Sequence, residues 1–364
     1  MKNQSIYFPG LTGVRAIASL IVVVWHTDMF LNSFSLSDFW LRQSGLAGYA
    51  VNLFFVLSGF LITYLLLAEK TKTGKIDIKK FYLRRILRIW PLYYMGIFLS
   101  IILMYLDVIN VPNDFFFSLV LYFFLLANLS YALKIAITSI TPLWSVGVEE
   151  QFYAIWPWII KKSRNVLRSL LIVIVFYFIL KTILWIQNPS SWAYSFITHL
   201  RIDLMALGGI GAEIIFKKRR RVVKFVHSIP LQIIAWAVLF ISILYKPIHI
   251  TSFLDNEINS IFYLVILLNV SSNPKTIITL DYKILNFFGK ISYGLYVYHM
   301  IVILIFLKYF DNINFEGYYY LELLIPVVIV GFTTLLATIS FYYFEKPILK
   351  IKHRYEVIKS NVKS

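Results

Sequence analysis

Long apolar stretches, separated by short polar segments, dominate this sequence of 364 residues. A helix needs about 20 mainly apolar residues to cross a bilayer. Stretches of about this length lie near residues 12–30, 48–68, 90–108, 143–160, 166–187, 200–216, 231–246, 256–272, 291–308 and 320–344. A further stretch, 114–131, is short and aromatic-rich and ends in Asn128 and Ser130. The pattern predicts an all-α, polytopic integral membrane bundle.

Basic residues mark alternate loops of this predicted bundle. Most of the 35 lysines and arginines fall at 70–88, 161–168, 217–224, 275–290 and 346–364. Cytoplasmic loops carry an excess of Lys and Arg, so both termini are predicted to be cytoplasmic. An odd number of spans must then separate the outer loop at 109–113 from the inner cluster at 161–168. Either 114–131 or 143–160 must therefore fail to span the membrane. We expect 114–131 to be the re-entrant or interfacial segment, because it is short, which leaves about ten spans.

Composition narrows the class of protein further. Hydrophobic residues make up 59% of the chain and charged residues only 15%, although the net charge is +17. A soluble domain has about 25% charged residues, so a water-soluble enzyme, a disordered tail and a nucleic-acid-binding domain are excluded. The absence of cysteine excludes disulfides, thiolate nucleophiles and Cys-ligated metal sites.

Ionisable residues inside apolar stretches are functional candidates, because burying a charge in a bilayer is costly. Arg15 and His26 lie 11 residues apart, which places them on nearly the same face of the first span. One interpretation is a cytosol-facing anion contact leading to a general base. The other is a positive-inside anchor with a histidine that only packs between helices.

The segment WSVGVEEQFYAIWP (144–157) places Glu149 and Glu150 inside an otherwise apolar and aromatic span. Adjacent helical residues point about 100° apart, so one carboxylate is expected to face the site and the other to pair structurally. Tyr153 follows Glu149 by one helical turn, and Trp144 and Ser145 precede the pair near the outer surface. The alternative is an ion pair between helices, for example with Arg201.

Arg85 and Arg88 lie three residues apart on one helix face at the cytoplasmic surface. Two guanidinium groups on one face are suited to bidentate phosphate binding. They are equally suited to contacting anionic lipid headgroups beside the Tyr and Trp anchors of this segment. Spacing alone leaves both interpretations open.

The remaining polar candidates are scattered along the chain. Ser58 and Gly59 lie in mid-span, where small residues allow close helix approach, and a nucleophilic serine is the weaker interpretation. Arg201 and Asp203 precede a glycine-rich packing surface. The polar set is completed by His199, His299 and Glu345. No ligand-type spacing links His26, His199 and His299, so we expect no metal site.

Several of these segments together resemble the acyltransferase family 3 of integral membrane proteins. The matching segments are GLTGVRAIASLIVVVWH (10–26), NLFFVLSGFLIT (52–63), RRILRIWP (84–91), WSVGVEEQFYAIWP (144–157), THLRIDLMALGGIGA (198–212), GKISYGLYVYH (289–299) and YYFEKP (342–347). They cover nearly the whole chain in order. Gly147 stands where a serine or alanine is common in that family.

The resemblance implies a membrane O-acyltransferase, most simply an O-acetyltransferase of a cell-surface polysaccharide or glycolipid. It implies acyl-CoA (acetyl-CoA) as donor, no permanently bound cofactor, and an acceptor hydroxyl of an O-antigen, capsule, peptidoglycan or exopolysaccharide. It makes His26 the catalytic base or transient acyl carrier, with Glu149 or Glu150 orienting its ring. Arg15, Arg85 and Arg88 become donor contacts, and Trp144 and Glu345 further functional positions.

The resemblance also carries expectations about organisation and location. Residues 1–345 are expected to form one transmembrane acyltransferase domain, followed by a short basic cytoplasmic tail at 346–364. Some family members add an extracellular SGNH hydrolase-like domain, which is not expected here. The protein is expected to be a multi-pass protein of the inner (cytoplasmic) membrane. Its expected partners are the lipid bilayer and other glycan-assembly proteins. The alternative function is a proton-coupled transporter or flippase for a glycan precursor.

Overall fold

Helices form almost all of the computed structural model, which describes residues 6–31, 45–245, 248–310 and 320–358 and has no strand within those ranges. The helices are α1 (Leu11–Leu31), α2 (Leu46–Thr73), α3 (Ile78–Tyr105), α4 (Phe115–Phe123), α5 (Ala127–Ala132), α6 (Trp144–Lys162), α7 (Val166–Gln187), α8 (Trp192–Leu200), α9 (Ile202–Phe216), α10 (Arg220–Val226), α11 (Ile229–Leu244), α12 (Asp255–Ser272), α13 (Lys283–Phe310), α14 (Tyr320–Ser340) and α15 (Lys346–Lys352). Three short turns of other helical types complete the described chain: η3 (Thr138–Leu143), η4 (Phe341–Glu345) and η5 (His353–Tyr355). The all-α prediction is confirmed.

Six described helical segments are long and apolar enough to cross a membrane. They are α1, α2, α3, α7, α13 and the segment from α14 through α15, and α10 with α11 makes a seventh if this pair, bent by 51°, is one span. The predicted spans 143–160, 200–216 and 256–272 correspond to α6, α9 and α12, which are not among them. The count of ten spans therefore stays a prediction.

The aromatic-rich segment 114–131 is broken into α4 and α5. The break lies at Leu125, whose φ of 61° is in the left-handed region that continuing helices avoid. Nine and six residues are too few to cross a bilayer. Its exclusion from the predicted spans thus agrees with the structure.

The core of the bundle is organised around α2, most of whose apolar window is buried. Helix α2 packs closely against α9, because glycines allow the backbones of these two helices to approach each other. A Cβ on Gly59 would lie 1.9 Å from the Met205 carbonyl oxygen, and one on Gly208 would lie 2.0 Å from that of Val56. The predicted role of these glycines in close helix packing is confirmed.

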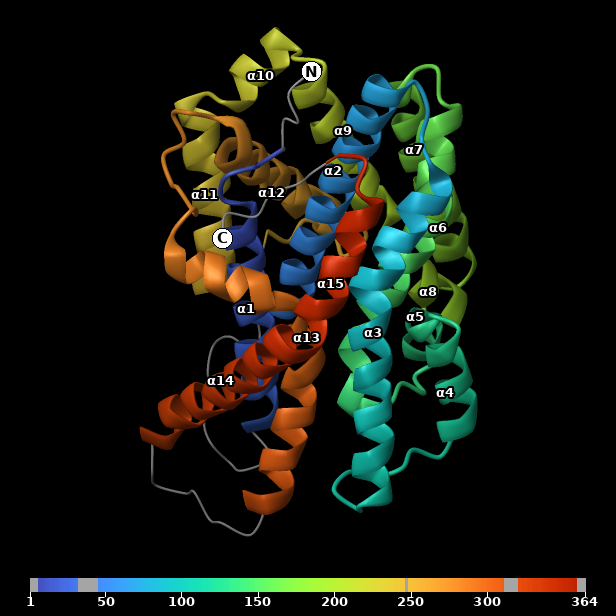
Figure 1. Ribbon diagram of the computed structural model, residues 1–364, viewed down its shortest axis with the longest axis vertical. Helices are drawn as coiled ribbons and strands as arrows, with labels where there is room; N and C mark the ends of the chain where they lie inside the picture. The colour runs from blue at the N-terminus through green and yellow to red at the C-terminus, as the bar shows by residue number, and fades with distance from the viewer. Residues whose placement is uncertain (1–5, 32–44, 246–247, 311–319, 359–364) are drawn as a thin grey trace.

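Three of the basic junctions between helices gather at one end of the bundle. Figure 1 shows the α2–α3, α6–α7 and α9–α10 junctions together at the top. Lys70 joins two of them, because its Nζ donates to the carbonyl oxygens of Ile160 at 3.0 Å and Ser163 at 3.0 Å. This clustering is what the positive-inside pattern predicts. The terminal residues themselves lie outside the described ranges.

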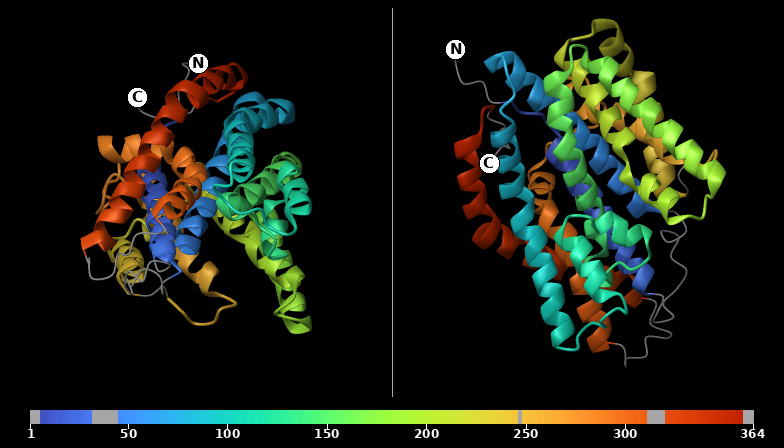
Figure 2. Two further views of the ribbon diagram at one scale, coloured as in Figure 1. Left: turned by 90° about the horizontal axis from the view of Figure 1, so that it is seen from below. Right: turned by 90° about the vertical axis from the view of Figure 1, so that its right-hand side faces the viewer.

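The segment predicted as a basic tail is folded as far as residue 358. The π-helical turn η4 continues α14 into α15, and both views place α15 beside α3 (Figures 1 and 2). Arg84 of α3 fixes the following turn by donating from Nη1 to the Tyr355 carbonyl oxygen at 2.9 Å. Residues 346–358 therefore form part of the wall of the bundle.

Candidate functional site

A cavity of about 200 Å³ lies between α1, α2, α3, α6, α13 and α15. Its walls are mostly apolar and aromatic, with polar side chains at particular places. The polar and charged lining residues are Tyr7, Thr12, Arg15, Ser58, Arg85, Arg88, Ser145, Glu149, Tyr153, Ser292, Tyr293, Tyr296 and Lys352. The sequence-predicted candidates Arg15, Ser58, Arg85, Arg88, Ser145, Glu149 and Tyr153 are thus brought together.

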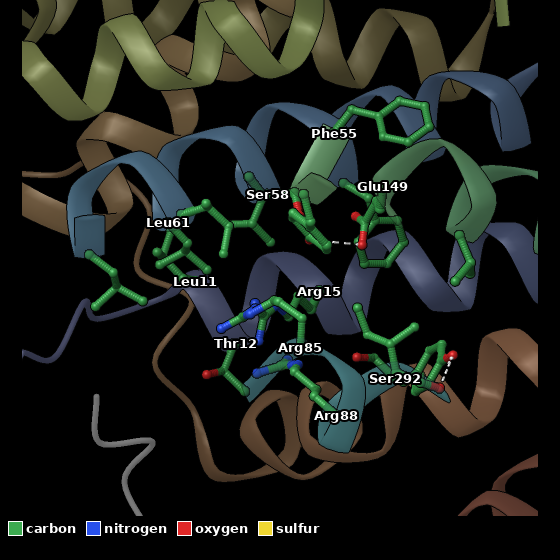
Figure 3. A pocket seen from close by; sticks show the side chains of 18 of the residues that line it. Leu11, Thr12, Arg15, Phe55, Ser58, Leu61, Arg85, Arg88, Glu149 and Ser292 are labelled. Atoms are coloured by element: carbon green, nitrogen blue, oxygen red, sulfur yellow. Dashed lines mark hydrogen bonds between the residues drawn. The ribbon is translucent and has the colours of Figure 1, made fainter. Parts of the chain in front are cut away.

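Three arginines gather on one side of the cavity, Arg15 from α1 and Arg85 and Arg88 from α3 (Figure 3). The predicted spacing of three residues does place Arg85 and Arg88 on the same face. Among the described residues, none of the three has a carboxylate oxygen within 4.0 Å. The Nε of Arg85 is buried without a hydrogen-bond partner. Partly buried cations that lack close anionic partners are suited to binding an anion.

Glu149 faces these arginines across the cavity and belongs to a short chain of hydrogen bonds. The Tyr153 hydroxyl donates to Glu149 Oε2 at 3.0 Å, and Ser58 Oγ lies 2.5 Å from that hydroxyl. Because a carboxylate can only accept hydrogen bonds, the Tyr153 hydroxyl donates to Glu149, and the Ser58 hydroxyl in turn donates to Tyr153. Ser58 therefore holds the Tyr153 hydroxyl that bonds Glu149, and this arrangement does not favour Ser58 as a nucleophile.

Glu150 points away from the cavity. Its Oε2 accepts a hydrogen bond from Trp90 Nε1 at 2.9 Å, while its Oε1 is buried without a partner. The expectation of one site-facing and one structurally paired carboxylate is met, with Glu149 in the first position. The pair does not bond Arg201 in either case.

His26 does not line the cavity and is separated from the lining residue Tyr296 by the ring of His299. Tyr296 lines the cavity, its ring centroid lies 5.9 Å from that of His299, and His299 lies 5.0 Å from His26. His26 Nδ1 is 2.8 Å from the Val22 carbonyl oxygen. A carbonyl only accepts, so Nδ1 carries the proton and Nε2 is the basic nitrogen of the neutral ring. The expectation that Glu149 or Glu150 orients this ring is wrong, because the Val22 carbonyl fills that role.

His299 is fully buried and is held in the same way. Its Nδ1 lies 3.2 Å from the Leu295 carbonyl oxygen, and its Nε2 has no hydrogen-bond partner. One turn earlier on α13, the Tyr296 hydroxyl lies 2.7 Å from Ser145 Oγ and donates to the Pro142 carbonyl oxygen at 2.9 Å. These hydrogen bonds fix the Tyr296 ring between the cavity and the His299 ring, whose centroid is 5.9 Å away.

Trp144 joins an aromatic cluster beside the cavity rather than lining it. Its ring stacks on Tyr131 with a centroid separation of 5.6 Å, and His199 packs edge-on against Trp144 at 5.3 Å. Burial, and next the nearby Arg201 cation, lower the pKa of His199 to about 4. This imidazole is therefore neutral at pH 7.

Arg201, Asp203 and Glu345 lie outside the cavity lining. Arg201 is the left-handed residue (φ 47°) that separates α8 from α9, and Asp203 is buried near the Lys181–Glu257 ion pair. Glu345 is buried at the end of η4, close enough to Arg88 for the two charges to interact. The structure thus assigns these three predicted candidates to the surroundings of the site.

Comparison with known proteins gives the family. The family profile described as "Acyltransferase domain", of acyltransferase family 3, matches residues 8–343. The chain belongs to this family. O-acetyltransferase OatA of Staphylococcus aureus (strain NCTC 8325 / PS 47) is 30% identical over 372 residues, which cover 94% of this chain and 57% of OatA. A putative O-acetyltransferase of S. aureus strain COL is also 30% identical, over 94% of this chain and 58% of its own length.

The family match makes the protein an acyltransferase, and its apolar helices make it a multi-pass membrane protein. The chain spans less than two thirds of the length of the relatives it matches. No solved structure matches it significantly. The transporter interpretation gains no support from either comparison.

Six of the polar lining residues are not among the sequence-predicted site residues: Tyr7, Thr12, Ser292, Tyr293, Tyr296 and Lys352. Ser292, Tyr293 and Tyr296 precede His299 at helical spacing on α13, so the period of that segment is a signal for them. Lys352 is missed because the basic residues around it are assigned to a cytoplasmic tail. The apolar residues just before Lys352 could have indicated that the helix continues to this position.

Proposed function

We propose that this acyltransferase moves an acetyl group from cytoplasmic acetyl-CoA to a hydroxyl of a cell-surface polysaccharide or glycolipid on the outer side of the inner membrane. The observation that supports this most directly is the cavity, in which three arginines lie on one side and most of the remaining wall is apolar or aromatic (Figure 3). None of the three has a carboxylate of the described residues within 4.0 Å. Coenzyme A has the matching chemistry, with phosphates at one end and a long, thin pantetheine arm ending in the thioester.

The donor contacts follow from the charges. Arg15, Arg85 and Arg88 supply guanidinium groups for the phosphates, and fork-shaped donors suit phosphate oxygens. The walls that remain, including Phe54, Leu57 and Leu61, fit the uncharged arm. The basic end of the bundle is the cytoplasmic end in this proposal, where coenzyme A is available.

The chemistry is assigned to His26. Its Nε2 takes the proton of the acceptor hydroxyl, the oxygen attacks the thioester carbonyl, and the carbon–sulfur bond breaks. The proton then passes from His26 to the departing thiolate, so that an ester and free coenzyme A are formed. An alternative order places the acetyl group first on Nε2 and then on the acceptor. Both orders require the thioester to extend past Tyr296 towards His26.

The acceptor is proposed from the relatives, which carry the name O-acetyltransferase. An O-antigen, a capsule, a peptidoglycan and an exopolysaccharide all provide sugar hydroxyls on the outer side. Other glycan-assembly proteins are the partners such an enzyme requires.

The test is a single substitution at the proposed base. His26→Ala is expected to abolish acetylation of surface glycans, measured by mass spectrometry of the glycans for the added acetyl mass. His227→Ala is the matched control, because His227 is half-buried and its Nε2 lies 3.2 Å from Ser272 Oγ, away from the cavity. Normal acetylation by a correctly inserted His26→Ala protein would refute the assignment.

A further inference from the structure

The segment 346–358, here called the C-terminal strap, supplies a charged residue to the cavity. Lys352, the last residue of α15, lines the cavity together with Arg85 and Arg88, and its side chain is only 13% exposed. The family match ends at residue 343. Lys352 therefore belongs to a part of this chain that the family profile does not describe.

A smaller hollow of about 30 Å³ extends the cavity beneath the strap. The two share Ile62, Leu65, Arg85 and Lys352 as lining residues. The hollow alone is lined by Leu66 and Glu69, near the end of α2, and by Arg84, one turn before Arg88 on α3. It is thus the part of the binding space nearest the basic end of the bundle.

Charges in the hollow are unevenly matched. Glu69 Oε2 lies 3.0 Å from Arg84 Nη2, and its Oε1 accepts from the Asp77 backbone N–H, so this carboxylate is fully engaged. Glu356 Oε1 lies 3.6 Å from Lys352 Nζ and only 3.0 Å from His353 Nδ1. Lys352 therefore has a long, shared contact, and Arg85 has none within 4.0 Å among the described residues.

The strap is held in place by its own backbone. Arg84 Nη1 donates to the Tyr355 carbonyl oxygen at 2.9 Å, and Lys72 Nζ donates to that of Val357 at 3.4 Å. Lys352 is consequently presented at a fixed position beside Arg85. Two cations fixed together in a half-closed hollow form a site for a phosphate monoester.

We propose that Lys352, with Arg85, binds the 3′-phosphate on the ribose of the coenzyme A donor, and that Glu356 holds Lys352 when the donor is absent. This inference rests on the proposed function, since it assigns one end of the same donor. The 3′-phosphate is the donor group farthest from the thioester, and the hollow is the part of the space farthest from His26. Arg15 and Arg88, deeper in the cavity, are left for the diphosphate.

The experiment compares two donors in the reconstituted full-length enzyme, acetyl-CoA and 3′-dephospho-acetyl-CoA. Lys352→Gln is expected to raise the KM for acetyl-CoA about tenfold or more, the effect of one lost charge-assisted hydrogen bond. The kcat and the KM for the dephospho donor are expected to stay unchanged. Lys352→Arg should keep the preference for acetyl-CoA. Lys350→Gln, on the exposed face of the same helix, is the matched control and should behave as wild type.

Glu356→Gln is expected to change the KM for acetyl-CoA in the direction opposite to Lys352→Gln. Freeing Lys352 from its carboxylate is expected to lower the KM for acetyl-CoA about threefold, with no effect on the dephospho donor. If Lys352→Gln behaves like Lys350→Gln, or raises both KM values equally, the inference is wrong. If the wild-type enzyme transfers nothing from acetyl-CoA, the proposed function itself fails.

Discussion

Two groups of charges lie inside this bundle, and they are built differently. The peripheral group joins α7, α9 and α12, where Lys181 Nζ lies 2.6 Å from Glu257 Oε1 and also donates to the Phe253 carbonyl oxygen. With Arg201 and Asp203, this group holds two cations and two carboxylates. The cavity group has Arg15, Arg85 and Arg88 with no carboxylate within 4.0 Å in the described part of the chain.

The difference separates structural charges from ligand-binding ones. Charges that neutralise one another in a closed interior hold helices together, and removing one partner leaves the other buried and unpaired. An excess of one sign around a hollow is unfavourable until a ligand of the opposite sign arrives. We therefore expect substitutions in the peripheral group to change stability and those in the cavity group to change activity.

The largest effect is expected for the double variant Arg85→Gln/Arg88→Gln. Two charge-assisted hydrogen bonds to the donor would be lost, and kcat/KM for acetyl-CoA should fall by about 10²- to 10⁴-fold. The thermal unfolding temperature should stay the same or rise, because cations that repel one another have been removed. Activity assays with reconstituted protein and unfolding in detergent check both parts.

A decrease of less than about threefold in kcat/KM would exclude these arginines from the donor site. A large drop in unfolding temperature would show that they are structural, like the peripheral group. Arg168→Gln, on the other side of the bundle at the start of α7, serves as a control with no expected effect.

The next effect concerns stability and uses Lys181→Met. Its loss leaves the Glu257 carboxylate without the cation that lies 2.6 Å from it, which should lower the free energy of unfolding by about 3–5 kcal/mol. Acetyl transfer per folded molecule should remain near the wild-type value. Thermal unfolding in detergent and assays on the purified folded fraction measure the two quantities.

Adding Glu257→Gln to Lys181→Met sharpens this result. The double variant no longer contains the unpaired carboxylate and should recover part of the lost stability. Lys224→Met, at an exposed position of α10, should change stability by less than about 0.5 kcal/mol. If Lys181→Met instead lowers kcat at unchanged stability, the distinction between the two groups fails.

Much of the site could be predicted because helical periodicity relates residues on one helix. Arg15 lines the cavity, and His26, on the same helix, lies behind the Tyr296 and His299 rings. Arg85 and Arg88 do share a face. The glycine packing of α2 on α9 follows from small residues alone. These features depend only on local spacing, which the sequence contains.

Contacts between helices could not be predicted in the same way. Periodicity does not show which residues of another helix reach the His26 ring. The expected partner is a glutamate of α6, whereas the structure has the Val22 carbonyl of the same helix. Lys352 reaches the cavity because η4 and α15 continue α14 against α3, an arrangement decided by packing. The charge pattern assigns this lysine to a tail, because a count of charges contains no information about contacts between helices.

The smallest effects are expected from a matched pair of tyrosines, one in each group. Tyr153→Phe removes the hydroxyl that donates to Glu149 and contacts Ser58, and it should lower kcat about tenfold with little change in KM for acetyl-CoA. Tyr177→Phe removes a hydroxyl that donates to the Ile197 carbonyl oxygen at 3.0 Å in the peripheral region. It should cost about 1 kcal/mol of stability and leave kcat unchanged. Steady-state kinetics and unfolding of both variants test this difference. Equal losses of kcat would show that either hydroxyl acts through general packing of the interior, and not through the Glu149 carboxylate.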